Sequence, residues 1–482
     1  MEHFGMYIDG ERCEAAGGAW FDTDNPYTAA PWAKVAKGDA GDADRAVQAA
    51  YRAFTSGEWP KMKAADRGKL LHRLGDLVLE NFEELAQAET RDNGKVISET
   101  RNQMRTMADW YHYYGGLADK IQGDTVPVDE DSFLNYTRFE PLGVCVAVTP
   151  WNSPLRLLSW KLAPALAAGN TMVIKPSSNT STSSLVFMRL VEEAGFPAGV
   201  VNVVTGGGGE VGMTLVEHPL TAKIAFTGST EAGTQVYEAG ARHLKRVTLE
   251  LGGKSPNILF ADADLEKAIP GVVAGIFAST GQTCIAGSRL LVQDSIHEEV
   301  LNKIVAVASS RKMGDPTHED TQLGPVATAS QFDTIMEYVD VAKADGAELM
   351  CGGGQGSGPE CGDGRFVEAT IFDGVDNKMR IAQEEVFGPV LSVICFKDDE
   401  EAITIANDID FGLAAGIWTE NLSRAHKVAR GVQSGTVWVN TYRQQSPMMP
   451  FGGYKKSGLG RESGSAMIRE YLQQKSVWVG LD

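Results

Sequence analysis

Cys284 and Glu250 are the two residues whose types and surroundings best suit covalent and acid–base chemistry. Cys284 lies in Gly-Gln-Thr-Cys-Ile-Ala-Gly (281–287), where small neighbours leave a thiol accessible and backbone N–H groups can stabilise its thiolate. Glu250 ends an apolar run and is followed by glycines, as expected of a carboxylate at the ligand-binding edge of a parallel sheet. Each residue alone also fits a plainer interpretation, a buried core cysteine or a solvated loop acid.

Two further segments have features of an anion-binding site. Residues 226–233 read as a strand, a glycine turn and a helix start, an order that directs backbone N–H groups and a helix N-terminus at a phosphate. Lys175 directly follows another apolar run, where it can reach a phosphate or ribose or simply be exposed. Neither segment matches the Gly-x-Gly-x-x-Gly dinucleotide motif, and the glycines at 206–209 are a weak signal on their own.

These residues fall at the ends of short apolar strands that alternate with helices from residue 142 onward. Such alternation predicts parallel sheets covered by helices on both faces. The pattern divides near residue 253, so we expect two α/β lobes. The predicted strands are 144–148, 171–174, 200–204, 224–226 and 246–250 in the first lobe and 257–260, 290–293, 391–396, 414–418 and 436–440 in the second. The predicted helices are 154–168, 180–194 and those that begin after Gly209, after Thr230 and at Leu265.

The remainder of the chain predicts a helical first third and two isolated strands. An apolar stripe predicts a long helix that stops at Asn93, before a glycine that commonly ends helices. Ser153 is expected to cap the helix that begins at Pro154. Strands at 133–139 and 476–479 belong to neither lobe. The stripe consists of Leu70, Leu71, Leu74, Leu77, Val78, Phe82 and Leu85.

Composition excludes several classes of protein. The 482 residues suggest about three domains, and 44 basic against 63 acidic residues give a formal charge of −19, which argues against nucleic-acid binding. Neither a signal peptide nor an apolar stretch of bilayer length is visible, and six cysteines in so long a chain are not a disulfide framework. We therefore expect a cytoplasmic protein. The eight histidines show no metal-ligand spacing, so no metal is expected.

Taken together and in order, seven motifs resemble the aldehyde dehydrogenase superfamily, and the resemblance covers essentially the whole chain. Glu250 and Cys284 have the 34-residue separation of that family. The resemblance implies an α/β fold with two doubly wound parallel-sheet lobes and a small β oligomerisation element. The motifs are Thr-Pro-Trp-Asn (149–152), Lys-Pro-Ser (175–177), Phe-Thr-Gly-Ser-Thr (226–230), Glu-Leu-Gly-Gly-Lys-Ser-Pro (250–256), Gly-Gln-Thr-Cys (281–284), Glu-Val-Phe-Gly-Pro (385–389) and Pro-Phe-Gly-Gly (450–453).

The resemblance implies NAD(P)-dependent oxidation of an aldehyde to the free carboxylic acid. Cys284 would form a thiohemiacetal and then a thioester, with the oxyanion held by the Asn152 amide and the Cys284 backbone N–H. Glu250 would activate the water that hydrolyses the thioester, and relatives that transfer the acyl group to coenzyme A commonly lack this glutamate. Lys161 and Glu462 match positions linked to proton movement and support of the site. The alternative is a catalytically silent relative, which would be expected to lose one of Cys284, Glu250 or Asn152.

For the cofactor, NAD or NADP, the resemblance places Lys175 on the adenosine ribose, Ser229 on the diphosphate and Glu385 on the nicotinamide ribose. Many NAD-preferring members have glutamate where this chain has Ser178, and a serine would tolerate the 2′-phosphate of NADP. The other expected cofactor contacts are Thr149, Pro150, Trp151, Ser177, Gly208, Gly212, Phe226, Gly228, Leu251, Gly252 and Phe387.

The resemblance also places Arg156 and Trp160, four residues apart on one helix, beside the substrate channel. Arg443, on a loop at the channel mouth, would join Arg156 in binding a carboxylate-bearing semialdehyde. Alternatively the arginines face solvent or pair with local acids, and Met107, Trp160 and Phe451 line an apolar channel for aromatic or aliphatic aldehydes. The remaining expected substrate contacts are Thr283 and Ile285.

The implied organisation is a cofactor-binding domain (1–122 and 142–252), a catalytic domain (253–455) and the oligomerisation element (123–141 and 468–482). The two isolated strands would form this element and pair between the subunits of a homodimer or homotetramer. We expect a small-molecule aldehyde as the substrate, and neither nucleic acid nor membrane as a partner.

Overall fold

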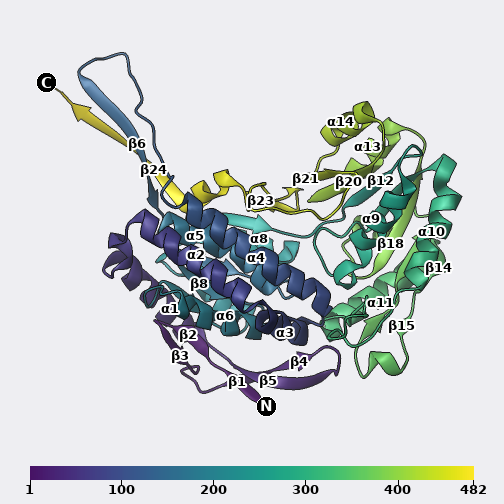
Figure 1. Ribbon diagram of the computed structural model, residues 1–482, viewed down its shortest axis with the longest axis horizontal. Helices are drawn as coiled ribbons and strands as arrows, with labels where there is room; N and C mark the ends of the chain where they lie inside the picture. The colour runs from purple at the N-terminus through teal and green to yellow at the C-terminus, as the bar shows by residue number, and fades with distance from the viewer. Residues whose placement is uncertain (482) are drawn as a thin grey trace.

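The computed structural model describes residues 1–481 and has a mixed α/β fold with two large sheets, as expected (Figure 1). The first sheet has eight strands in the order β23-β11-β10-β7-β8-β9-β2-β3, and the five from β11 to β9 are parallel. The parallel strands are β7 (Val144–Val148), β8 (Thr171–Lys175), β9 (Val201–Val203), β10 (Thr221–Thr227) and β11 (Arg246–Glu250). The antiparallel edge strands are β2 (Met6–Ile8), β3 (Glu11–Cys13) and β23 (Gly458–Leu459).

Helices cover both faces of this sheet, which explains why its strands are apolar without alternation. Cys145 and Ala147 of β7 face a hydrophobic cluster that includes α5 (Pro154–Ala168), whereas Val144 and Val146 face a second cluster that includes α1 (Ala40–Thr55). The other helices of this lobe are α2 (Ala64–Glu80), α3 (Phe82–Asn93), α4 (Ile97–Leu117), α6 (Thr182–Glu193), α7 (Met213–Glu217) and α8 (Thr230–Arg242).

The second sheet has seven strands in the order β14-β17-β18-β13-β12-β20-β21, and only β14 runs antiparallel. Every strand predicted for this lobe is present, whereas β14 and β17 were not expected. The strands are β12 (Pro256–Leu259), β13 (Arg289–Gln293), β14 (Glu348–Cys351), β17 (Thr370–Asp373), β18 (Val390–Phe396), β20 (Ala414–Trp418) and β21 (Thr436–Val439). The helices are α9 (Leu265–Phe277), α10 (His297–Ser309), α11 (Ala329–Ala344), α12 (Arg380–Gln383), α13 (Asp399–Asn407) and α14 (Leu422–Gly431).

The first third contains long helices as expected, but it differs from the sequence prediction in two ways. A three-stranded sheet, β1-β5-β4, precedes the helices, and its short, partly exposed strands carry little apolar pattern. The predicted long helix is divided at Asn81, whose side chain donates a hydrogen bond to the carbonyl of Leu77 and so ends α2 before α3 begins. The strands of the three-stranded sheet are β1 (Glu2–Phe4), β4 (Trp20–Asn25) and β5 (Ala30–Ala36). Two short strand pairs occur elsewhere: β15 (Gln355–Gly356) with β16 (Phe366–Val367), and β19 (Phe411–Gly412) with β22 (Tyr454–Lys455).

The two isolated strands predicted from the sequence form an antiparallel pair that projects from the body of the molecule (Figure 1). β6 (Phe133–Pro141) and β24 (Leu472–Gly480) pair along their whole lengths. The last residue of the expected 468–482 element, Asp482, lies outside the described residues. Within residues 1–481, no helix is both long and apolar enough to cross a membrane.

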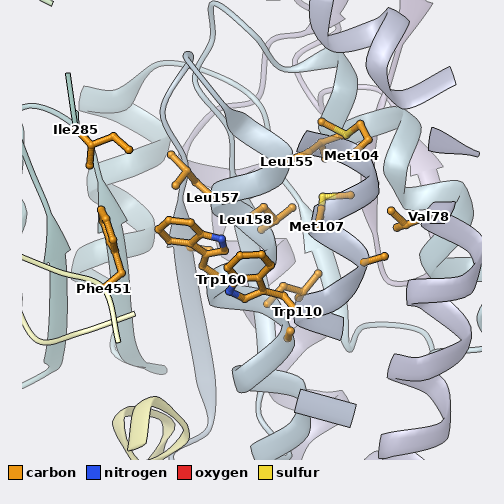
Figure 2. Packing of buried hydrophobic residues seen from close by; sticks show 14 of the residues in the cluster. Val78, Met104, Met107, Trp110, Leu155, Leu157, Leu158, Trp160, Ile285 and Phe451 are labelled. Atoms are coloured by element: carbon orange, nitrogen blue, oxygen red, sulfur yellow. The ribbon is translucent and has the colours of Figure 1, made fainter. Parts of the chain in front are cut away.

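The largest hydrophobic core lies beside the reactive cysteine. Figure 2 shows side chains of α4 and α5 packed together, with Trp110 stacked on Trp160 at a ring-centroid distance of 5.5 Å. The same cluster extends to Ile285, next to Cys284, and to Phe451. Helices of the first lobe therefore form a rigid support for the loops that carry the reactive groups.

Candidate active site

Cys284 lies on a tightly held loop between α9 and β13. Ser279 and Thr280 both have φ of 54°, and Gly281 has φ of 69°, so three successive residues adopt the left-handed conformation. A Cβ atom at Gly281 would collide with the carbonyl of Gly388. The Glu99 carboxylate accepts hydrogen bonds from the Ser279 backbone N–H at 2.8 Å and its hydroxyl at 2.5 Å, which holds the strained turn in place.

The thiol lies where two cavities meet. One cavity has a volume of about 410 Å³ and the other about 520 Å³, and Cys284, Asn152 and Leu157 line both of them. A molecule bound in one cavity can therefore react at the sulfur with a molecule bound in the other. We refer to them below as the smaller and the larger cavity.

Burial keeps the Cys284 side chain as a neutral thiol. It raises the pKa of this group to about 12, and the carboxylates of Glu385 and Glu250 add to the effect. Because the thiolate is the nucleophile, the site needs a base that removes the proton.

Glu250 has the environment of such a base. It ends β11, lines the larger cavity and is almost fully buried, and neither carboxylate oxygen has a hydrogen-bond partner within the described part of the chain. Burial raises its pKa well above the usual value, and the nearby charge of Glu462 raises it further. A carboxylate with a raised pKa and free oxygens accepts a proton readily near neutral pH.

Lys161 and Glu462 form a buried ion pair behind Glu250. Lys161 Nζ also donates a hydrogen bond to the Thr227 hydroxyl at 2.7 Å. Neither residue lines the two cavities, so the structure places both near Glu250 without direct access to a ligand. Lys161 lowers the pKa of Glu250 and Glu462 raises it, so the pair can adjust the base.

Asn152 lies just before the N-terminus of α5 and directs its side chain at the cysteine loop. Its Nδ2 donates a hydrogen bond to the carbonyl of Gln282 at 2.9 Å, and the second amide hydrogen remains free for a ligand. Ser153 is the N-cap residue of this helix and Pro154 takes the first helical position, both as predicted, but the Ser153 side chain makes no capping hydrogen bond. Ser153 Oγ instead accepts a hydrogen bond from Lys95 Nζ at 2.6 Å.

The larger cavity is lined by the expected cofactor residues, with the exception of Gly212. Gly212 lies beneath the stem of Lys175, whose Nζ donates to the carbonyl of Pro176 at 2.9 Å. Ser229 caps α8, because its hydroxyl accepts a hydrogen bond from the Ala232 N–H at 3.2 Å. Ser229 also lines the cavity, so the N-terminus of α8 faces it. The other expected residues along its wall are Thr149, Pro150, Trp151, Ser177, Ser178, Gly208, Phe226, Gly228, Leu251, Gly252, Glu385 and Phe387.

At the cysteine end of this cavity, Glu385 Oε1 accepts a hydrogen bond from the Gly253 N–H at 2.9 Å. Burial raises the pKa of Glu385 to about 7. A side chain on Gly252 would collide with the Glu385 carboxylate, which explains the glycine. Phe387 packs edge-on against Trp151 with ring centroids 5.3 Å apart.

Sequence reasoning missed several cavity residues that come from the second lobe, among them two on α11. Gln331 and Thr334 of α11 line the larger cavity, and Gln331 Nε2 donates to the carbonyl of Val386 at 2.9 Å. No local motif marks them, because their position depends on how α11 packs against a distant loop.

Arg156 and Arg443 both line the smaller cavity. Arg156 donates to the Thr106 hydroxyl at 3.2 Å and to Gln445 Oε1 at 2.7 Å, while its Nε has no partner. Arg443 donates to the carbonyl of Ala274 at 3.2 Å. Within residues 1–481 neither arginine forms a salt bridge, and the one carboxylate on the wall of this cavity, Glu99, is hydrogen-bonded to Ser279.

The apolar wall of the smaller cavity differs from the expectation. Trp160, Thr283 and Ile285 line it as expected, but Met107 is fully buried in the core. Phe451 does not reach this cavity: it packs edge-on against Trp160, with ring centroids 5.0 Å apart, and lines a separate pocket of about 30 Å³ (Figure 2).

No group of three or more metal-ligating side chains occurs in the part of the chain that the structure covers, and all six cysteines are unpaired.

Comparison with known proteins gives a consistent result. A model of the aldehyde dehydrogenase family matches residues 13–477. The chain is 46% identical to human retinaldehyde dehydrogenase 3, over 99% of this chain and 93% of that protein. It is 46% identical to (Z)-2-((N-methylformamido)methylene)-5-hydroxybutyrolactone dehydrogenase of Acinetobacter baylyi, over 99% and 97%. The NAD+ complex of an aldehyde dehydrogenase from Bacillus cereus superimposes with a TM-score of 0.98 at 44% identity, covering 100% of this chain and 97% of that one.

Proposed function

The chain belongs to the aldehyde dehydrogenase family, and from that premise we propose that it oxidises an aldehyde to the free carboxylic acid through a thioester on Cys284. The observation that carries this proposal is the position of Cys284, where the smaller and larger cavities meet. The aldehyde occupies the smaller cavity and NAD the larger one. NAD, when bound, supplies the nicotinamide ring that accepts the hydride.

Cys284 and Asn152 carry out the first step. The sulfur attacks the carbonyl carbon after its proton passes to Glu250, and the carbonyl oxygen becomes an oxyanion. The free amide hydrogen of Asn152 and the backbone N–H of Cys284 donate to that oxyanion. Because Asn152 is already held against the cysteine loop, little reorganisation is needed when charge develops.

Glu250 carries out the second step. Its unpartnered carboxylate removes a proton from a water molecule, which attacks the thioester and releases the carboxylic acid and the Cys284 thiol. Between the two steps Glu250 releases its proton toward the Lys161–Glu462 pair.

The walls of the larger cavity fit a dinucleotide. The N-terminus of α8, with Gly228 and Ser229, suits the diphosphate, because helix N-termini bind anions. Lys175 would hold the adenosine ribose and Glu385 the nicotinamide ribose. Ser178 lines the same cavity and brings no negative charge, which supports use of NADP as well as NAD.

We infer that the substrate carries a negative charge. Arg156 and Arg443 line the smaller cavity without a salt bridge, and the Glu99 carboxylate on the same wall is hydrogen-bonded to Ser279, so neither arginine has a directly paired counter-ion. A carboxylate on the substrate would supply that counter-ion through paired hydrogen bonds. The alternative, a neutral aromatic aldehyde, is favoured by the ring of Trp160 on the same wall.

One assay tests both parts of the proposal. Formation of reduced nicotinamide is followed by absorbance with aliphatic aldehydes, benzaldehydes and carboxylate-bearing semialdehydes, each with NAD and NADP. Wild type is compared with Cys284→Ala and Arg156→Leu. We expect semialdehydes to react best, Cys284→Ala to be inactive, and Arg156→Leu to lower kcat/KM for semialdehydes at least about tenfold.

The same assay has three outcomes that contradict parts of the proposal. A preference for neutral aromatic aldehydes, or an unchanged semialdehyde rate in Arg156→Leu, overturns the anionic substrate and keeps the reaction. An active Cys284→Ala variant overturns the mechanism. Folded wild type that binds NAD but oxidises none of the aldehydes favours a catalytically silent role.

The paired strands β6 and β24 support a homo-oligomer. They project from the body and expose Phe133, Leu134 and Trp478, which is 60% exposed. We propose that these side chains pack against another subunit in a homodimer or homotetramer, because large exposed apolar side chains that lie together commonly mark an interface.

A further inference from the structure

Lys95 is a buried lysine that the proposed mechanism does not use. It lies in the short segment between α3 and α4 and is only 6% exposed. Its Nζ donates three hydrogen bonds: to Gln103 Oε1 at 3.2 Å, to the carbonyl of Asn152 at 2.5 Å and to Ser153 Oγ at 2.6 Å. An ammonium group has three N–H donors, so all of them are used.

The same segment holds Asn152 a second time. Asn93 Nδ2 donates to the carbonyl of Asn152 at 3.3 Å, and Asn93 Oδ1 accepts from the Lys95 N–H at 3.0 Å. The Asn152 peptide is thus held from one side by Lys95 and Asn93, while its side chain is bound to Gln282 on the other.

Stabilisation of α5 does not explain why a lysine lies at the N-terminus of this helix. Lys95 Nζ lies at the N-terminus of α5, where the helix dipole favours a negative charge. Glu89 already meets that need, because its Oε2 accepts a hydrogen bond from the N–H of Leu155 in the first turn of α5 at 3.3 Å. Within the described residues Lys95 forms no salt bridge, so its charge rests on three neutral acceptors. Burial lowers its pKa to about 8, while the charges of Glu89 and Glu99 act in the opposite direction.

We propose that Lys95 is a positioning residue for the reaction: by fixing the Asn152–Ser153 peptide it aims the Asn152 amide at the oxyanion formed on Cys284. The inference rests on the proposed role of Asn152 as an oxyanion donor. Lys95 lines neither the smaller nor the larger cavity, so it acts on the reaction only through its hydrogen bonds to the Asn152–Ser153 peptide.

A double-mutant cycle tests this proposal. Lys95→Met keeps an unbranched apolar stem one atom shorter and removes the N–H donors, and Asn152→Ala removes the group on which Lys95 is proposed to act. We expect Lys95→Met to lower kcat about 10- to 100-fold, the usual effect of a small misplacement of a catalytic group. KM for the aldehyde and Kd for NAD should change less than about threefold. In the Asn152→Ala background, Lys95→Met should have almost no further effect, because coupled residues are not additive.

Two controls separate positioning from general support of the fold. The rate at which iodoacetamide alkylates Cys284 should be the same in wild type and Lys95→Met, since the thiol itself is not moved. Lys245→Met removes a lysine that likewise donates to two backbone carbonyls, those of Val216 and His218, and it should leave kcat within about twofold of wild type. Lys95→Gln, with a polar head at the same place, replaces Lys95→Met in the cycle if the methionine variant does not fold.

The outcomes distinguish the two proposals. An unchanged kcat in Asn152→Ala overturns the role of Asn152 itself. A large loss in Asn152→Ala together with an unchanged kcat in Lys95→Met overturns the positioning role alone. Fully additive losses, or a slower alkylation of Cys284 in Lys95→Met, also overturn it, because Lys95 would then act on the loop and not through Asn152.

Discussion

Burial affects the reactive side chains of this molecule more than any single neighbour does. It is the largest cause of the raised pKa of Cys284, Glu250 and Glu385. Residue types and spacing in the sequence predicted which groups these are, because the motifs around them are local. They did not predict Lys95, or that Phe451 stops behind Trp160, since both depend on contacts between segments far apart in the chain.

Glu250→Gln should slow both chemical steps. The amide cannot take a proton from water, so the thioester should accumulate, and kcat should fall by about 10²- to 10⁴-fold. A burst of about one reduced nicotinamide per Cys284, measured by stopped flow, should still appear because hydride transfer precedes hydrolysis, but it should form more slowly because the variant also lacks the base that takes the thiol proton. Glu348→Gln, at an exposed position of β14, is the matched control. A variant that keeps the full steady-state rate contradicts the role of Glu250.

The raised pKa of Glu250 also gives wild-type activity a defined pH dependence. The carboxylate acts as a base only when it has lost its proton, and burial and the charge of Glu462 move that loss to higher pH than for an ordinary glutamate. We expect kcat to fall as pH decreases through the raised pKa, and the residual rate of Glu250→Gln to lack that fall. A wild-type rate that is flat from pH 5 to 8 would disprove this, and both enzymes can be measured in one buffer series of constant ionic strength.

Ser178→Glu should remove any use of NADP. A carboxylate at this position of the larger cavity repels a 2′-phosphate, so kcat/KM with NADP should decrease at least about tenfold while the value with NAD stays similar. Ser178→Gln has the same size without the charge and should keep NADP activity. Equal losses with the two cofactors in Ser178→Glu would mean that the side chain lies away from the 2′ position.

At the scale of helices and strands, apolar pattern was sufficient wherever an element is buried on both faces. β7, α5, β11 and β20 begin and end within a residue of their predicted bounds. The pattern failed where strands are short and half exposed, as in the first 36 residues, and where a single side chain, Asn81, ends a helix. The ends of such helices and strands depend on individual hydrogen bonds, which cannot be predicted from hydrophobic periodicity.

The backbone conformation of Gly281 helps to position the loop that carries Cys284. Gly281→Ala should displace the Cys284 loop, because a Cβ collides with the Gly388 carbonyl and a φ of 69° is strained for alanine. We expect kcat to fall at least about tenfold and the loop to lose about 1–3 kcal/mol of stability, which thermal unfolding with and without NAD would record. Gly116→Ala, in α4 with open space around it, should instead be stabilising by about 0.5–1 kcal/mol. Full activity in Gly281→Ala would show that the loop tolerates displacement.

At the scale of the whole molecule, the two large sheets and the sheet to which each predicted strand belongs followed from the sequence, but the strand order within the sheets did not. The order of the strands depends on which buried faces fit together, and no short sequence pattern carries that information. The division into domains at 1–122 with 142–252, 253–455, and 123–141 with 468–482 stays a proposal, and limited proteolysis at the mostly exposed residues 122–131 would examine the boundary of the oligomerisation element.

The projecting strands give a prediction about assembly. Trp478→Glu places a charge at the most exposed apolar side chain of β24. We expect the molar mass in multi-angle light scattering to fall to that of a smaller oligomer or a monomer. Leu422→Glu changes an equally exposed residue on α14 and should leave the mass unchanged. A wild-type protein that is already monomeric contradicts the proposed role of this strand pair.

The meeting of the two cavities at Cys284 has a consequence for inhibition. A compound that fills only the 410 Å³ space competes with the aldehyde and leaves the dinucleotide site open, so its apparent affinity is independent of, or even increased by, the concentration of cofactor. A doubly charged, thiol-directed compound would combine the two arginines with the sulfur and would discriminate against relatives whose corresponding wall is neutral. Selective ligands therefore belong on the side of the sulfur that carries the two arginines.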